Sequence, residues 1–123
     1  MELWQKLQIK PDAVVAVVNP PADGHGLTGP FTQTDDAASA SAVVVFVTNR
    51  AELTAHGSPG VQAALDDRLA WFAYPKAKQL GTDLNRDLLA QELVAQGIDP
   101  VRQVSLDDVW SALRFRPAFR AAR

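Results

Sequence analysis

Two apolar stretches, Ala13-Val14-Val15-Ala16-Val17-Val18 and Ala42-Val43-Val44-Val45-Phe46-Val47, decide the fold of this chain. Each is a continuous run rich in valine, with turn-forming residues after it. Runs of this kind are typical of strands that are covered on both faces, as in parallel sheets. Leu69-Ala70-Trp71-Phe72-Ala73-Tyr74 is a third such run, closed by Pro75. The sequence therefore predicts three buried, mostly parallel strands.

The connections between these runs predict helices and one long loop. Residues 2–8 favour a short helical turn, and residues 19–41 read as a loop with a short element around residues 35–40. Asn49 with Glu52 three residues later forms a capping-box pattern at a helix start. Gly57 is placed to end that helix, and Ser58-Pro59 predicts the start of a second one.

The C-terminal half predicts one longer helix and two short strands. Thr82 or Asp83 caps a helix over residues 83–96, with leucines at helical spacing and Gly97 behind it. Residues 101–105 and 110–115 read as strands. The second alternates in polarity, which favours an antiparallel strand near a sheet edge, with Trp110 half exposed.

These elements predict a single α/β domain over residues 1–123. We expect a small Rossmann-like three-layer fold of about five strands, mostly parallel, with an antiparallel pair at the C-terminal end. The pattern resembles a reduced methyltransferase sheet. Its cofactor site is not expected, because Pro20-Pro21 stands where a glycine-rich turn would have to follow the first strand.

Composition excludes several classes of protein. The chain has 123 residues and a mass of 13.3 kDa, enough for one domain. It has no cysteine, so disulfide, thiolate and thiolate–zinc chemistry are excluded. No apolar run approaches the roughly 20 residues of a membrane span, and the start lacks a signal-peptide pattern. We therefore expect a cytoplasmic protein that does not bind membranes.

The net charge of −2 argues against nucleic acid as a partner, since nucleic-acid-binding domains are usually basic. The charge is unevenly distributed, however. Residues 1–67 carry three basic residues against eight acidic ones, and residues 68–123 carry nine against six. The last ten residues contain no acidic residue and four arginines, Arg114, Arg116, Arg120 and Arg123. They form either a solvated basic tail or a contact for an anion or a partner.

The sequence contains possible cofactor and metal motifs, but their surroundings and spacing do not match those of known sites. The stretch from Gly24 to Gly29 matches G-x-G-x-x-G, but it does not directly follow a strand or open a helix, as a dinucleotide site requires. His25 and His56 are the only histidines, and they are not paired at a metal-ligand spacing. The sequence therefore predicts neither a cofactor nor a metal.

The most informative segment is residues 74–87, which leaves the carboxyl end of the third strand and enters a helix. Ligands of open α/β sheets bind outside such strand ends, and the first turn of a helix offers free amides to an anion. We expect the ligand-binding residues to be Lys76, Lys78, Thr82, Asp83 and Arg86. Alternatively, Asp83 occupies the positive helix end or pairs with Lys76 or Arg86 as a structural lock.

A second candidate surface is on the last strand. Trp110 shares a strand face with Arg114 and Arg116, and tryptophan with arginine is a common combination in protein interfaces. These three residues are the expected partner contacts, either for another protein or for a second copy of the chain.

The same segments carry a family resemblance. Residues 71–76, 82–87 and 104–117 resemble a bacterial family catalogued as "domain of unknown function 3052". The resemblance implies a small Rossmann-like cytoplasmic protein with no assigned activity. It marks as motif positions Tyr74, Pro75, Lys76, Thr82, Asp83, Arg86, Asp108, Trp110, Ser111 and Arg114.

Three functions follow as hypotheses. The first is a non-enzymatic domain that binds a small anionic ligand or a protein partner at the carboxyl end of the third strand. The second is a small enzyme that uses Tyr74, Lys76 and Asp83 for acid–base chemistry on an anionic substrate. The third is a structural or oligomerising module that pairs through the strand of Trp110.

Overall fold

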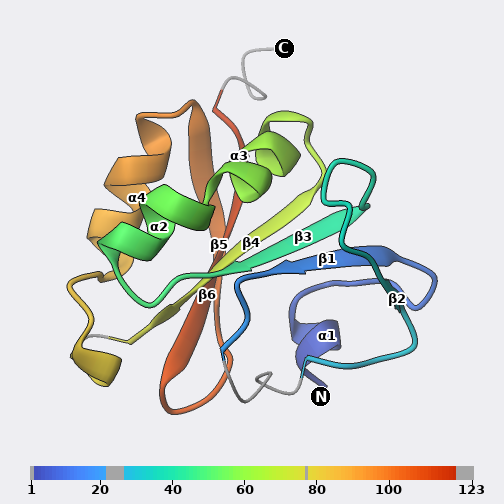
Figure 1. Ribbon diagram of the computed structural model, residues 1–123, viewed down its shortest axis with the longest axis horizontal. Helices are drawn as coiled ribbons and strands as arrows, with labels where there is room; N and C mark the ends of the chain where they lie inside the picture. The colour runs from blue at the N-terminus through green and yellow to red at the C-terminus, as the bar shows by residue number, and fades with distance from the viewer. Residues whose placement is uncertain (1, 22–26, 77, 119–123) are drawn as a thin grey trace.

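A six-stranded mixed sheet forms the centre of the α/β fold (Figure 1). The computed structural model describes residues 2–21, 27–76 and 78–118. The strand order is β2-β1-β3-β4-β6-β5, in which the first four strands are parallel and β6 and β5 are antiparallel to their neighbours. The strands are β1 (Val14–Val18), β2 (Thr32–Gln33), β3 (Ala42–Phe46), β4 (Leu69–Pro75), β5 (Ile98–Ser105) and β6 (Trp110–Pro117).

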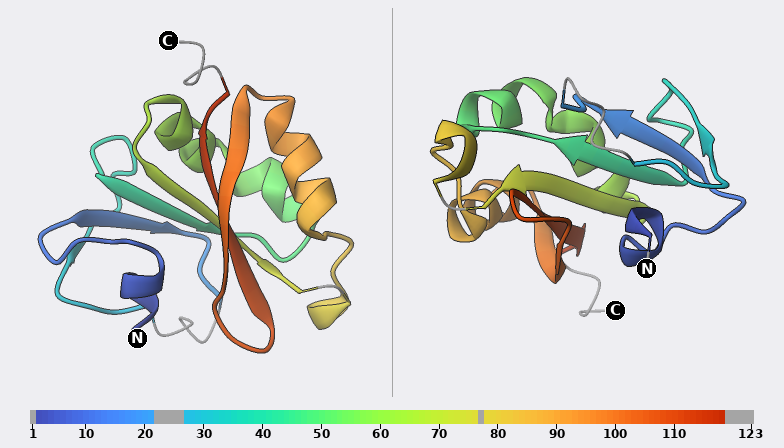
Figure 2. Two further views of the ribbon diagram at one scale, coloured as in Figure 1. Left: turned by 180° about the vertical axis from the view of Figure 1, so that it is seen from behind. Right: turned by 90° about the horizontal axis from the view of Figure 1, so that it is seen from below.

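The helices divide unequally between the two faces of the sheet. Three helices pack on one face, namely α2 (Arg50–His56), α3 (Ser58–Leu65) and α4 (Arg86–Val94). The other face is covered by α1 (Leu3–Lys6) and the loops around it, as the view from behind shows (Figure 2). A short 3-10 helix, η1 (Gln79–Gly81), lies between β4 and α4.

Both sheet faces are apolar because β3 and β4 carry apolar side chains at every position. Phe72 points to the three helices and packs edge-on against Phe115, with ring centroids 5.5 Å apart. Its neighbour Trp71 points to the opposite face, where the indole Nε1 donates a hydrogen bond of 2.8 Å to the carbonyl of Leu7. The core is therefore two layers, one on each side of the sheet.

The three predicted strands and the C-terminal antiparallel pair are confirmed, with β3 and β4 buried and β1 buried at only two of its five positions. Two further details are corrected. The loop after β1 contains a sixth strand, Thr32–Gln33, whereas residues 37–39 form only a turn. The strand of Trp110 is not at an edge, because β6 lies between β4 and β5. Trp110 is only 6% exposed, since its ring packs edge-on against Phe46 on the α1 face.

The predicted helix starts are confirmed in part. The side chain of Asn49 accepts the amide of Glu52 at 2.9 Å, as a cap should. The Glu52 carboxylate instead accepts the amide of Thr48 at 2.8 Å and the amide side chain of Asn19 at 3.0 Å. Gly57 ends α2 and α3 follows directly, with its proline in the first turn.

The helix predicted over residues 83–96 is shorter, Arg86–Val94, and its cap is Asn85 rather than Thr82 or Asp83. The Asn85 side chain accepts the amide of Leu88 at 2.9 Å. Gly97 follows the helix with a φ of +95°, a conformation that favours glycine. Across the described ranges, the helices are all too short or too polar to cross a bilayer.

Candidate functional site

A groove of about 550 Å³ opens at the carboxyl end of β4. It forms there because the β5–β6 hairpin returns beside β4 and brings its loop end next to the start of α4. This edge is where ligands bind in open α/β sheets. The residues that line the groove are Tyr74, Lys76, Asn85, Arg86, Gln103, Ser105 and Ser111.

Lys76 is held at the mouth of the groove by the hairpin loop. Its backbone amide donates to the carbonyl of Val109 at 2.7 Å, and its Nζ donates to the Ser105 hydroxyl at 2.8 Å. No carboxylate of the described chain pairs with this ammonium group. Lys76 therefore supplies a positioned cation whose charge is not neutralised by an ion pair.

Arg86 begins α4 on the other side of the groove. Its only ion pair with a described residue is to the adjacent Asp87, with 3.2 Å between Nη1 and Oδ1. Both side chains are more than half exposed, and ion pairs at such positions contribute about 0–1 kcal/mol. An anionic ligand that binds this guanidinium group more tightly than Asp87 does can therefore replace Asp87 as its partner.

Tyr74 forms the floor of the groove in a hydrogen-bonded cluster. Its hydroxyl accepts from Gln103 Nε2 at 3.2 Å, and the same amide group reaches the Ser111 hydroxyl at 3.4 Å. Ser111 donates to the carbonyl of Val104 at 3.0 Å. Burial raises the pKa of Tyr74, although the bond with Ser111 and the charge of Arg86 act in the opposite direction. Tyr74 therefore stays protonated and can donate a hydrogen bond.

Tyr74 is the only tyrosine of the chain, so its titration can be followed directly by tyrosinate absorbance. We expect its midpoint in the folded protein to lie above the ordinary pKa of 10.0, and to rise further in Arg86→Met. Because the folded state holds this proton more tightly, its contribution to stability is complete below pH 10 and decreases as the pH rises through the folded pKa. A midpoint at or below that of the urea-unfolded protein would contradict the buried position.

The structure brings together two of the five predicted ligand residues, Lys76 and Arg86. The other three do not line the groove. Thr82 closes a local turn, in which its hydroxyl accepts the amide of Leu84 at 2.9 Å. Lys78 is exposed, with a left-handed backbone φ of 67°.

Asp83 has a structural contact that the sequence does not predict. Its carboxylate accepts the amide of Arg50 at 2.8 Å, so it lies at the N-terminus of α2 and not of α4. The expected pairing with Lys76 or Arg86 is therefore wrong, but a lock between loop and helix exists at another helix. Asp83 also does not join Tyr74 and Lys76 in the groove, as the acid–base hypothesis requires.

Sequence reasoning misses the contribution of the hairpin. Gln103 and Ser105 lie two residues apart on β5, and they share a strand face with their cross-strand neighbour Ser111. This i, i+2 spacing of polar residues is visible in the sequence. The spacing points to the groove only because the hairpin pairs with β4, and the sequence alone does not show that pairing.

The three predicted partner contacts have contacts within the chain. Trp110 is core. Arg114 Nη1 donates to the Gln8 side chain at 3.1 Å. Arg116 makes a two-bonded ion pair with Asp67, with both N–O distances at 2.9 Å. The aromatic anchor expected for an interface is therefore not presented on the surface.

Comparison with known proteins finds no matching family model, curated protein or solved structure. The resemblance to the bacterial family stays a prediction. Within the described residues, no three histidine, cysteine, aspartate or glutamate side chains gather as a metal site. Gly24, His25 and Gly26 of the glycine motif lie outside these residues.

Proposed function

We propose that this chain binds a small phosphate-bearing anion in the groove at the carboxyl end of β4, without acting on it chemically. One observation carries the proposal. Lys76 and Arg86 face the same groove, and none of the residues that line it is a carboxylate. A dianion therefore meets two cations in the lining, and the nearest acid, Asp87, lies outside the lining as the exposed ion-pair partner of Arg86.

The remaining groups of the groove suit the same ligand. Phosphate oxygens accept hydrogen bonds, and the protonated Tyr74 hydroxyl is a donor. The Ser105 hydroxyl becomes a second donor if it turns away from the carbonyl of Asp107, to which it donates at 3.3 Å. Arg86 offers a planar fork of N–H groups, while Lys76 acts as a point charge. The first amides of α4 add the partial positive charge of a helix N-terminus, and Asn85 leaves part of that turn uncapped because it accepts only the amide of Leu88.

The test is isothermal titration of the protein with inorganic phosphate at low ionic strength. The double variant Lys76→Met, Arg86→Met keeps both aliphatic stems and removes both charges. We expect it to weaken phosphate binding by about tenfold or more, because each charge-assisted hydrogen bond contributes about 1.5–3 kcal/mol. Lys78→Met is the matched control, since Lys78 is a nearby lysine outside the groove, and it should leave binding unchanged.

Folding of the double variant separates the two readings of these cations. Arg86 is exposed and Lys76 is half-buried, and methionine keeps both aliphatic stems, so the urea midpoint should change little. If the double variant unfolds, the two cations are structural. If Lys78→Met weakens phosphate binding as much as the double variant does, the binding is non-specific. Either result contradicts the proposal.

We also propose the finer relationships that the sequence suggests, a reduced Rossmann-like fold in a bacterial cytoplasmic protein. Support for the fold comes from the adjacent parallel strands β1, β3 and β4, with α2 and α3 connecting the last two. The position of the groove at their carboxyl edge agrees with it.

A further inference from the structure

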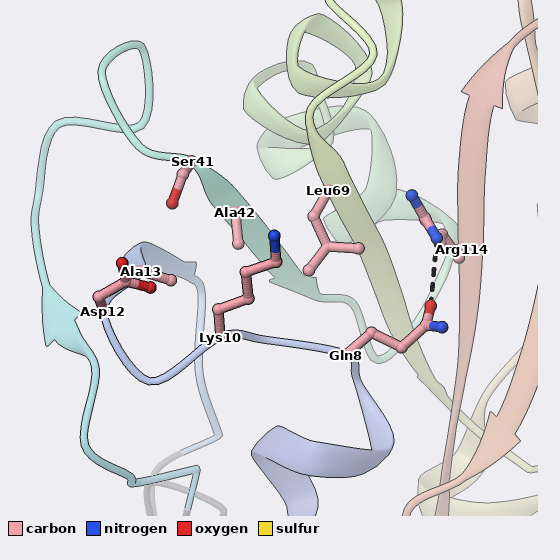
Figure 3. Close-up of a pocket in the computed structure, with 8 residues that line it drawn as sticks. All are labelled: Gln8, Lys10, Asp12, Ala13, Ser41, Ala42, Leu69 and Arg114. Carbon is pink, nitrogen blue, oxygen red and sulfur yellow. Dashed lines mark hydrogen bonds between the residues drawn. The ribbon is translucent and has the colours of Figure 1, made fainter.

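A second pocket, of about 510 Å³, lies at the opposite edge of the parallel strands (Figure 3). Its apolar wall consists of Ala42 and Leu69, the first residues of β3 and β4, and of Ala13 just before β1. The rest of the lining is polar and comes from the segment after α1, from Ser41 just before β3 and from Arg114 of β6. This pocket shares no lining residue with the phosphate groove.

The segment after α1 is anchored so that its polar side chains are presented to this pocket. Leu7 and Ile9 are buried on the α1 face of the sheet, and the indole of Trp71 donates to the carbonyl of Leu7. The alternate residues Gln8 and Lys10 are exposed and line the pocket. Gln8 has a φ of +61°, an uncommon conformation for a residue other than glycine, and such positions gather at ligand sites.

No carboxylate among the described residues forms an ion pair with Arg114. Its Nη1 bonds only the neutral side chain of Gln8, and its buried Nε has no hydrogen-bond partner in the described chain. Burial lowers the pKa of Arg114, and so do the charges of Arg116 and Arg102, the second of which is its cross-strand neighbour. The charge of Asp67 raises the pKa of Arg114. However, Asp67 already accepts two hydrogen bonds from Arg116.

A buried guanidinium N–H without a hydrogen-bond partner is unfavourable, and here it belongs to the Nε of Arg114. Binding groups often have this property, since sites adapted to a ligand are rarely optimal for folding. Lys10 is the second cation of the pocket, and no described residue forms an ion pair with it. In Figure 3, Lys10 lies between Asp12 at one end of the pocket and Arg114 at the other.

We propose that this pocket binds a small organic carboxylate with a short apolar body, held by Arg114 and Lys10 against Ala42 and Leu69. The planar fork of an arginine matches a carboxylate, and the apolar wall takes the rest of the ligand. Asp12 reduces the charge of the lining to +1, which suits a monoanion. The groove at β4 has two cations and no acid, and it suits phosphate instead.

The test titrates isotope-labelled protein with isovalerate, followed by NMR, and repeats it with isovaleramide. Isovaleramide has nearly the same shape and no charge. We expect saturable shifts at Gln8, Ser41, Ala42 and Leu69 with isovalerate, and about tenfold or more weaker binding of the amide. This comparison needs no variant. Equal binding of both compounds, or no saturable shifts with isovalerate, would overturn the proposal.

Variants then assign the site to Arg114. Arg114→Met should weaken isovalerate binding by about tenfold or more, whereas Arg102→Met removes a cation that lies opposite on β5 outside the pocket and should leave binding largely intact. Because Arg114→Met removes an uncompensated charge, its urea midpoint should equal or exceed that of the wild type. A lower midpoint with unchanged binding would make Arg114 structural. Equally tight binding of inorganic phosphate to this pocket would contradict a carboxylate site.

Discussion

Trp71→Ala is expected to lower the free energy of unfolding by about 4 kcal/mol, in the range usual for removing a buried aromatic side chain. Trp71 has no exposed surface. Its ring fills the α1 side of β4, and its indole holds the carbonyl of Leu7 at 2.8 Å. The substitution leaves a cavity and also an unpaired carbonyl. Urea unfolding followed by circular dichroism measures the loss.

Trp71→Phe separates the two contributions of this side chain. Phenylalanine keeps most of the apolar volume but cannot donate to Leu7, so a loss of about 1–3 kcal/mol is expected from the orphaned carbonyl. Amide exchange of residues 7–10 should accelerate, because the indole anchors that segment to the sheet. If Trp71→Ala cost no more than Trp71→Phe, the ring would not be packed as described.

Gly60→Val is expected to lower the free energy of unfolding by about 3 kcal/mol, as overpacking of a dense core does. A Cβ at Gly60 of α3 would lie 2.6 Å from Phe72 Cζ and 2.8 Å from Val45 Cγ2. Both neighbours are fully buried, and Phe72 is held from its other side by Phe115. The helix must therefore move away from β3 and β4, which a urea midpoint will report.

Gln62→Val is the matched control for Gly60→Val. Gln62 is exposed on the same helix, so this substitution tests valine in α3 without a clash. We expect a loss of about 0.5 kcal/mol from helix propensity alone. Equal midpoints for the two variants would show that α3 does not lie as close to the sheet as the structure places it.

The sequence predicts the buried strands well for a physical reason. Strands covered on both faces need apolar residues at every position, and β3 and β4 show this as unbroken runs. β6 is predicted as an antiparallel strand near an edge, and it lies one strand in from the edge strand β5. The expected exposure of Trp110 is wrong, because its ring packs in the core. Arg114 and Arg116 suggest an exposed strand, yet both are half-buried because β6 pairs with a strand on each side, which local polarity does not reveal.

The candidate site is predictable only where it is local. Lys76 and Arg86 flank one strand-to-helix connection, so their place at the carboxyl edge follows from the chain order. Asp83 belongs to the same connection but binds the start of α2, and Ser105 and Ser111 arrive from the hairpin. These contacts depend on which elements become neighbours in the sheet, and no spacing within the segment encodes that.

The most direct test of the central claim is a phosphate titration of isotope-labelled wild-type protein at low ionic strength, followed residue by residue by NMR. The account predicts saturable shifts at the backbone amides of Lys76, Asn85, Arg86 and Ser105, which surround the groove at the carboxyl end of β4. Shifts that do not saturate, or that gather around Lys10 and Arg114 instead, would contradict it.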